Sequence, residues 1–147
     1  LHNGQVQTLT EAINRDATLI TVDPRFSVPA GKSKHWLPIR PGTDLALLLS
    51  WMHVLIEEDM YDHDYVERYT VGFGQLKDHV RDYTPEWVYL ETGIRPEVIR
   101  ETAREMAKAA PATIIHPGRH ATWYGDDTQR SRAVTKRKID LHQLAIG

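Results

Sequence analysis

The stretch TLITVDPRFS, residues Thr18–Ser27, and the stretch RPGTD, residues Arg40–Asp44, decide how this chain can fold. The first is a short β-branched, apolar run that stops at Asp23-Pro24-Arg25, as a strand does when it delivers polar groups to a sheet edge. In open α/β sheets, nucleotide ligands bind at the carboxyl edge of the strands. The second is a Pro-Gly turn directly before a helical run, so it offers unpaired backbone N–H groups. Together they predict a site for a ligand that carries phosphate or ribose.

The composition is that of an ordinary globular protein, and it excludes some classes of function. The 147 residues are 41% hydrophobic and 26% charged, which is enough for one domain with its own core. The formal net charge of −2 gives no reason to expect nucleic acid or an anionic membrane as a partner. The chain has no cysteine, so by itself it can hold neither a disulfide nor an iron–sulfur cluster.

The sequence shows no signal peptide and no membrane span. The opening LHNGQVQ has neither a basic nor an apolar region. The most apolar segment, Leu45–Ile56, contains His53, is followed by acidic residues and is too short to cross a bilayer, so we expect a buried helix. The missing initiator Met and an unrecognisable C-terminal ending suggest a piece of a larger protein.

Apolar spacing predicts strands at a few places and helices along most of the rest. Extended segments are expected at Thr18–Val22, His35–Ile39 and Ala112–Ile115. Val28–Lys34 is expected to be a loop because it contains Pro and Gly. Helices are expected at Gln5–Arg15, Asp44–Glu58, Tyr61–Tyr69, Gln75–Asp82, from Pro85 to Gly93, and at Pro96–Ala109. The order of strand, helices and strand favours an α/β fold with a parallel sheet.

Single residues mark helix starts and exposed faces. Thr43 or Asp44 can cap the central helix, and Asp62 and Thr84 can cap later ones. The outer face of the helix Pro96–Ala109 carries opposite charges that are often three residues apart, which favours ion pairs along that helix. These charged residues are Glu97, Arg100, Glu101, Arg104 and Glu105.

Each polar corner has two interpretations. In the first corner, Asp23 can accept hydrogen bonds from a base or ribose while Arg25 faces a phosphate; alternatively, Asp23 only closes a turn and Arg25 pairs on the surface. In the second, Gly42-Thr43-Asp44 can place amides against a phosphate or Asp44 against guanine N–H donors; alternatively, it is an ordinary helix cap.

A third polar corner follows Ala112–Ile115 and reads HPGRH. Arg119 there can contact an anionic group in a cleft or form a surface ion pair. His116 and His120 are four apart, but Pro117-Gly118 between them excludes a helix, and no carboxylate or thiolate spacing supports a metal site. The residues alone therefore indicate an α/β domain with a nucleotide site and without a complete catalytic apparatus.

Longer stretches resemble the molybdopterin oxidoreductases of the dimethyl sulfoxide reductase family. The matching stretches are TVDPRFS, the run WLPIRPGTDLALLLSWMHVLIEEDMYDHDYVERYTVGF, YTPEW, and PATIIHPGRHATWYGDDTQRSRA. They occur in family order over residues 1–133, and the last is most similar to catalytic subunits of the polysulfide and thiosulfate reductase branch. The tail at 134–147, VTKRKIDLHQLAIG, departs from the family pattern.

The resemblance implies that residues 1–133 are the family's Rossmann-like domain, which binds one guanine dinucleotide arm of a bis(molybdopterin guanine dinucleotide) cofactor. It places Val22, Asp23, Pro24 and Arg25 against the nucleotide end, and Gly42, Thr43 and Asp44 against the guanine. Pro117 and Gly118 match the loop near the pterin and metal. In that loop the resemblance implies that Arg119 faces the substrate cavity, as the one catalytic residue, where a cation can hold an anionic sulfur substrate.

The resemblance also implies what this chain lacks. The family's iron–sulfur cysteines and its metal ligand lie upstream of this segment, so no metal ligand is expected here. The full-length enzyme is expected to carry molybdenum or tungsten and a [4Fe-4S] cluster, with an iron–sulfur electron-transfer subunit and a membrane anchor subunit, commonly in the periplasm or at the membrane. Two alternatives are a free-standing nucleotide-binding module without redox activity and a non-functional truncated remnant.

Overall fold

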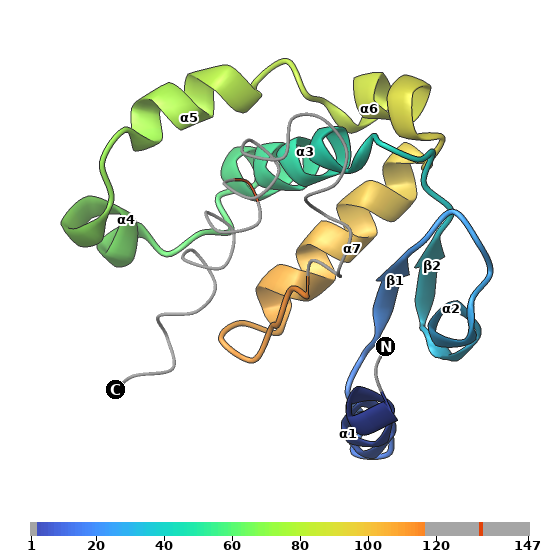
Figure 1. Ribbon diagram of the computed structural model, residues 1–147. Coiled ribbons are helices and arrows are strands. Elements are labelled where there is room, and N and C mark those ends of the chain that lie inside the picture. The colour runs from blue at the N-terminus through green and yellow to red at the C-terminus, as the bar shows by residue number, and fades with distance from the viewer. Residues whose placement is uncertain (1–2, 117–132, 134–147) are drawn as a thin grey trace. The chain divides into compact units, whose positions relative to one another are not determined.

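The computed structural model describes residues 3–116 and Ala133 (Figure 1). The chain divides into two compact units, Leu1–Ile39 and Arg40–Gly147. The elements, in chain order, are α1 (Asn3–Ile13), β1 (Ile20–Val22), α2 (Val28–Lys32), β2 (His35–Leu37), α3 (Asp44–Glu57), α4 (His63–Tyr69), α5 (Phe73–Val80), α6 (Pro85–Thr92) and α7 (Pro96–Lys108).

The first unit contains a small parallel sheet. β1 and β2 pair in the register Ile20 with His35, Thr21 with Trp36 and Val22 with Leu37. Parallel strands need a crossover between them, and α2 provides it. The predicted α/β fold with a parallel sheet is therefore confirmed, although β1 is shorter than expected and only half-buried.

The prediction of a loop at Val28–Lys34 was wrong, because α2 forms there. Pro29 lies in the first turn of this helix, where a proline interrupts no intrahelical hydrogen bond. Ala30 is buried, and Phe26 lies over Gly31, where an added Cβ would meet its ring at 3.6 Å. The short helix thus packs on the aromatic residue that follows the Asp23-Pro24-Arg25 corner.

The second unit is helical, and α3 is its central element. Figure 1 shows α3 running beside α7, and α3 also contacts α5 and α6. Its side chains are buried on most faces, as the apolar run predicted; those buried are Leu47, Leu48, Leu49, Ser50, Trp51, Met52, Val54, Leu55 and Ile56. Inside this core the Nε1 of Trp51 donates a hydrogen bond to the Oγ1 of Thr102 at 2.9 Å. The central helix is thus fastened to α7 by a buried polar contact as well as by packing.

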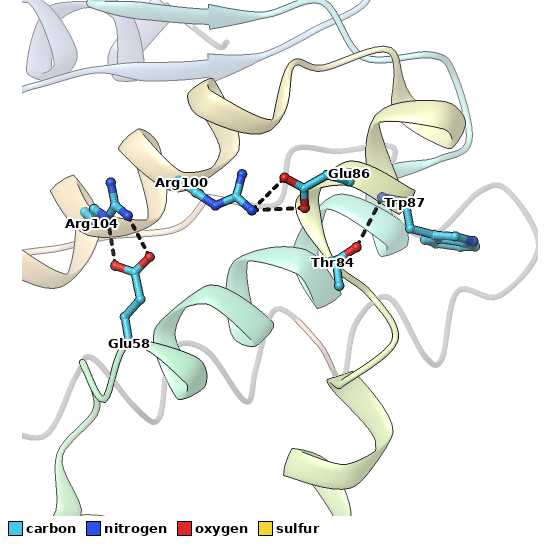
Figure 2. Close-up of polar contacts among 6 residues, drawn as sticks. All are labelled: Glu58, Thr84, Glu86, Trp87, Arg100 and Arg104. Carbon is cyan, nitrogen blue, oxygen red and sulfur yellow. Dashed lines mark hydrogen bonds and ion pairs between the residues drawn. The ribbon is translucent and has the colours of Figure 1, made fainter.

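The predicted helices of this unit are confirmed, with two of the expected caps. Asp62 accepts a hydrogen bond from the Tyr65 amide at 2.9 Å, and Thr84 accepts one from the Trp87 amide at 3.3 Å (Figure 2). Gly93 ends α6 in the left-handed region, with φ of 77°. Among the described residues, no helix has both the length and the apolar character needed to cross a membrane.

The predicted strand Ala112–Ile115 is absent, and this expectation was wrong. The residues after α7 instead close its last turn: the amide of Ala112 donates to the Ala109 carbonyl at 2.7 Å, and Thr113 Oγ1 donates to the Met106 carbonyl at 2.9 Å. The Ile114 side chain is 80% exposed. A β-branched run becomes a strand only beside a hydrogen-bonded neighbour, and within the described residues it has none.

The charges on α7 also pair differently from the expectation. Arg100 contacts both oxygens of Glu86 on α6 at 2.7 and 2.9 Å, and Arg104 holds Glu58, which follows α3 (Figure 2). These hydrogen bonds lower the pKa values of Glu86 and Glu58. The outer face of α7 therefore connects this helix to its neighbours, instead of forming ion pairs along itself through these two arginines.

Candidate functional site

The first polar corner, Asp23-Pro24-Arg25, is held in place by hydrogen bonds on three sides of Asp23. Its amide donates to the Leu37 carbonyl at 3.2 Å, and its carbonyl accepts from Trp36 Nε1 at 2.8 Å. Its Oδ1 accepts from the Arg25 amide at 2.9 Å, which closes a tight turn. Val22, the last residue of β1, pairs with Leu37 and so aligns the corner with the end of β2.

The side chain of Arg25 is available for a ligand. Arg25 is exposed, and its guanidinium has no hydrogen-bond or ion-pair partner among residues 3–116. The buried Oγ of Ser27 also lacks a partner within the described chain. Of the alternative interpretation of this corner, the turn made by Asp23 is present, but no surface partner of Arg25 lies among residues 3–116. A hydrogen-bonded turn therefore presents a guanidinium that is unpaired within residues 3–116, just after the end of a parallel strand.

The second corner, Gly42-Thr43-Asp44, leads into α3. Gly42 has φ of 85°, and a Cβ added there would meet nothing within 4 Å, so the space beside it is open. Thr43 occupies the N-cap position, but its hydroxyl donates to the Arg40 carbonyl at 2.8 Å and caps nothing. The expectation of a side-chain cap was wrong here, because φ of −101° and ψ of 14° at Thr43 are far from the extended conformation that capping needs.

Unpaired polar groups remain at the start of α3. The Thr43 carbonyl accepts from the amides of Ala46 at 3.1 Å and Leu47 at 3.4 Å, which leaves the preceding amides of the first turn without helical acceptors. Asp44 is half-buried, and its carboxylate accepts no hydrogen bond from the part of the chain that the structure describes. This corner combines backbone donors with a carboxylate acceptor, which suits a ligand that has both kinds of group.

Arg40 fastens the second corner to α6. Its amide donates to the Thr92 carbonyl at 3.0 Å, and its Nη1 donates to the carbonyls of Leu90 and, at 3.3 Å, Glu91. A cation at the C-terminal end of a helix is also favoured by the helix dipole. Gly93 lies beside Arg40, but a Cβ added there would make only an ordinary van der Waals contact with Arg40 Nε at 3.7 Å, so glycine is favoured here by its φ of 77°.

Sequence reasoning missed Arg40 and Trp36 as residues that hold the corners. Arg40 stands directly before the Pro-Gly turn, but its partners on α6 are 50 residues away, beyond any local pattern. The sequence predicts a parallel sheet but not its register, and it is the register pairing Thr21 with Trp36 that brings the indole beside Asp23.

The predicted site residues fall into three places. Val22–Arg25 lie in the unit Leu1–Ile39, and Gly42–Asp44 lie in the unit Arg40–Gly147; each corner is described within its own unit. Pro117, Gly118 and Arg119 lie outside the described residues. The structure therefore describes two of the three polar corners, each held by hydrogen bonds, and the third corner stays a prediction.

Comparison with known proteins defines the class. A family model described as molybdopterin oxidoreductase matches residues 4–143. Because the match covers most of the chain, the chain belongs to the molybdopterin oxidoreductase family, which confirms the resemblance found in the sequence.

Individual relatives agree with this assignment. The molybdopterin-containing subunit PhsA of thiosulfate reductase from Salmonella typhimurium is 40% identical over 136 residues, which cover 92% of this chain and 18% of PhsA. Acetylene hydratase from Syntrophotalea acetylenica is 40% identical over 115 residues, or 77% of this chain and 16% of that protein. The structure of acetylene hydratase from Pelobacter acetylenicus matches with a TM-score of 0.90 and 34% identity, over 97% of this chain and 20% of that one. The chain thus spans less than a quarter of the length of these relatives.

Proposed function

We propose that the chain is a part of the catalytic subunit of a molybdenum-dependent oxidoreductase and binds a guanine nucleotide end of a bis(molybdopterin guanine dinucleotide) cofactor. In this proposal, residues 1–133 are the Rossmann-like, guanine-dinucleotide-binding part, and 134–147 are a divergent tail. The observation that carries the proposal is the unpaired Arg25 guanidinium on a rigid turn at the end of a parallel strand, in a chain of the molybdopterin oxidoreductase family.

The chemistry of both corners fits a guanine nucleotide. Arg25 supplies the planar cation that binds phosphate oxygens, and Asp23 keeps one carboxylate oxygen for a ribose hydroxyl. Asp44 supplies an acceptor for guanine N–H donors, and the open space beside Gly42 lets a ligand approach the backbone. When bound, the cofactor supplies the redox chemistry, while these residues hold its nucleotide end.

The substrate proposal is carried by the likeness to thiosulfate reductase. With 40% identity over 92% of this chain, PhsA favours a small sulfur compound as the substrate of the whole enzyme. We assign Arg119 to the substrate side, next to Pro117 and Gly118, because a guanidinium can hold and polarise an anionic sulfur compound. The whole enzyme is proposed to carry molybdenum or tungsten and a [4Fe-4S] cluster, and to pass electrons through an iron–sulfur subunit and a membrane anchor subunit.

Calorimetric titration of the 147-residue chain with GDP tests nucleotide binding. Arg25→Gln is expected to weaken GDP binding about tenfold or more, since it removes a charge-assisted hydrogen bond. Asp44→Asn is expected to weaken GDP more than it weakens ADP. Arg15→Gln is the matched control, because Arg15 is an exposed arginine of the same unit, in the turn after α1, and it should leave affinity unchanged. A folded chain that binds no GDP, or an Arg25→Gln variant that binds as tightly as the unchanged chain, would contradict the proposal.

A further inference from the structure

We infer that Trp36 is a positioning residue for the nucleotide corner: its indole N–H holds the peptide that aims Arg25. The ligand in this inference rests on the proposed function. The bond runs from Trp36 Nε1 to the Asp23 carbonyl at 2.8 Å, and joins a residue of β2 to the residue that follows β1, 13 positions earlier in the sequence.

The Asp23 peptide unit leads directly into the turn, so its orientation determines where the turn points. Its carbonyl has Trp36 as donor, and the Oδ1 of the same residue receives the Arg25 amide at 2.9 Å. Pro24 lies between and has no amide of its own to hold the turn. Three hydrogen bonds therefore meet at Asp23, and two of them come from β2: the Leu37 carbonyl accepts from the Asp23 amide at 3.2 Å, and Trp36 donates to the Asp23 carbonyl. Of these two, the Trp36 bond holds the peptide that leads into the turn and toward Arg25.

Trp36 is itself held in one orientation. The ring of Phe26 meets it edge-on, with ring centroids 4.9 Å apart and planes at 68°. Phe26 in turn lies over Gly31 of α2. The indole is thus fixed by β2 on one side and by packing on the other, so its N–H is aimed at Asp23 before any ligand arrives. A donor that is already oriented lowers the entropic cost of binding.

Two substitutions separate the hydrogen bond from the packing. Trp36→Phe keeps an aromatic ring against Phe26 but has no N–H. Trp36→His removes the six-membered part of the indole yet keeps a donor, since imidazole Nε2, like indole Nε1, lies two bonds from Cγ. The measurement is made at about pH 8, above the ordinary histidine pKa of about 6.5, so that the imidazole is neutral. Trp87→Phe is the control, because Trp87 is an exposed tryptophan on α6.

The first readout is GDP affinity by calorimetry. A positioning role predicts that Trp36→Phe weakens GDP binding about five- to tenfold, the size expected for one net hydrogen bond, and that Trp36→His restores most of the affinity. A role in packing alone predicts the reverse order, since the imidazole fills less space than the phenyl ring.

The second readout needs no ligand. The Arg25 amide, which donates to Asp23 Oδ1, gives its own signal in a ¹H–¹⁵N spectrum of the 147-residue chain. The chemical shift of that amide is expected to change in Trp36→Phe, to return toward the value of the unchanged chain in Trp36→His, and to stay the same in Trp87→Phe.

The outcomes separate this inference from the proposed function. If the unchanged chain binds no GDP, the proposed function fails, and the Arg25 amide alone decides the role of Trp36. An Arg25 amide signal that is unchanged in Trp36→Phe overturns the positioning role whether or not GDP binds. Equal losses of affinity in Trp36→Phe and Trp36→His overturn it as well.

Discussion

Arg104 on α7 donates to both carboxylate oxygens of Glu58, the C-cap residue that follows α3, through hydrogen bonds of 2.7 Å from Nε and 2.8 Å from Nη2 (Figure 2). The two residues are 46 apart in the sequence. With the pair of Arg100 and Glu86, this contact ties α7 to the end of α3 and to the start of α6.

Glu58→Gln is expected to lower the melting temperature by about 2 °C, because it removes the negative charge from the bidentate, half-exposed ion pair with Arg104. Calorimetry or circular dichroism measures the change. The control is Asp78→Asn, since Asp78 pairs with Arg81 where both side chains are more than half exposed, and little change is expected there. A larger effect of Asp78→Asn would contradict the ranking of the pairs by geometry and burial.

The same pairs predict a dependence on acidity. The hydrogen bonds from Arg104 and Arg100 hold the pKa values of Glu58 and Glu86 below the ordinary value, so the folded state favours the charged form. Their contribution to stability is complete above the glutamate pKa of the unfolded chain, about 4.3, and is lost as the pH falls through the lower pKa of the folded chain.

Melting temperatures of the unchanged chain and of the double variant Glu58→Gln, Glu86→Gln test this pH dependence. The difference in melting temperature between the two proteins is expected to stay constant from about pH 7 to about pH 5.5 and to disappear toward about pH 3. A difference in melting temperature that grows on acidification would show that the ion pairs do not depend on pH in the direction proposed.

Thr102→Val is expected to lower the free energy of unfolding by about 1 to 3 kcal/mol, because it removes the hydroxyl that accepts the buried N–H of Trp51. Thr102→Ser keeps the acceptor and is the matched control. Denaturant unfolding measures stability, and exchange of the Trp51 indole proton reports the bond itself. Exchange that is equally fast in both variants would contradict the role given to this bond.

Arg40→Met is expected to loosen the second corner, because it removes the side-chain donor to the carbonyls at the end of α6. The Thr43 amide, which donates to the Arg40 carbonyl at 3.3 Å, should exchange with solvent about tenfold faster. Arg95→Met, at an exposed arginine before α7, is the control and should leave that exchange unchanged. If the Thr43 amide exchanges at the same rate in Arg40→Met, the turn does not depend on the Arg40 side chain.

Local patterns were sufficient for most helices and for the polar corners themselves. Asp62 and Thr84 begin their helices as predicted, and Gly93 ends one, because capping depends on groups within a few residues of each other. The patterns are wrong at Val28–Lys34, where an isolated Pro and Gly predict a loop, and at Ala112–Ile115, where a β-branched run predicts a strand. At Val28–Lys34 the contacts of α2 with β1, β2 and Phe26 decide the conformation, whereas Ala112–Ile115 has no strand neighbour among the described residues and bonds instead to the end of α7.

The family, the α/β class and the places where polar groups interrupt the regular elements follow from the order of residues along the chain. These features depend on residues close together in the sequence, so they can be recognised without knowing how the chain packs. Three contacts depend instead on how the chain packs: Trp36 donates to Asp23, Arg40 reaches the end of α6, and Arg104 pairs with Glu58 and not with a residue of its own helix. Each of these bonds joins residues distant in sequence, and its energy is gained only once strand pairing and helix packing have brought donor and acceptor within reach.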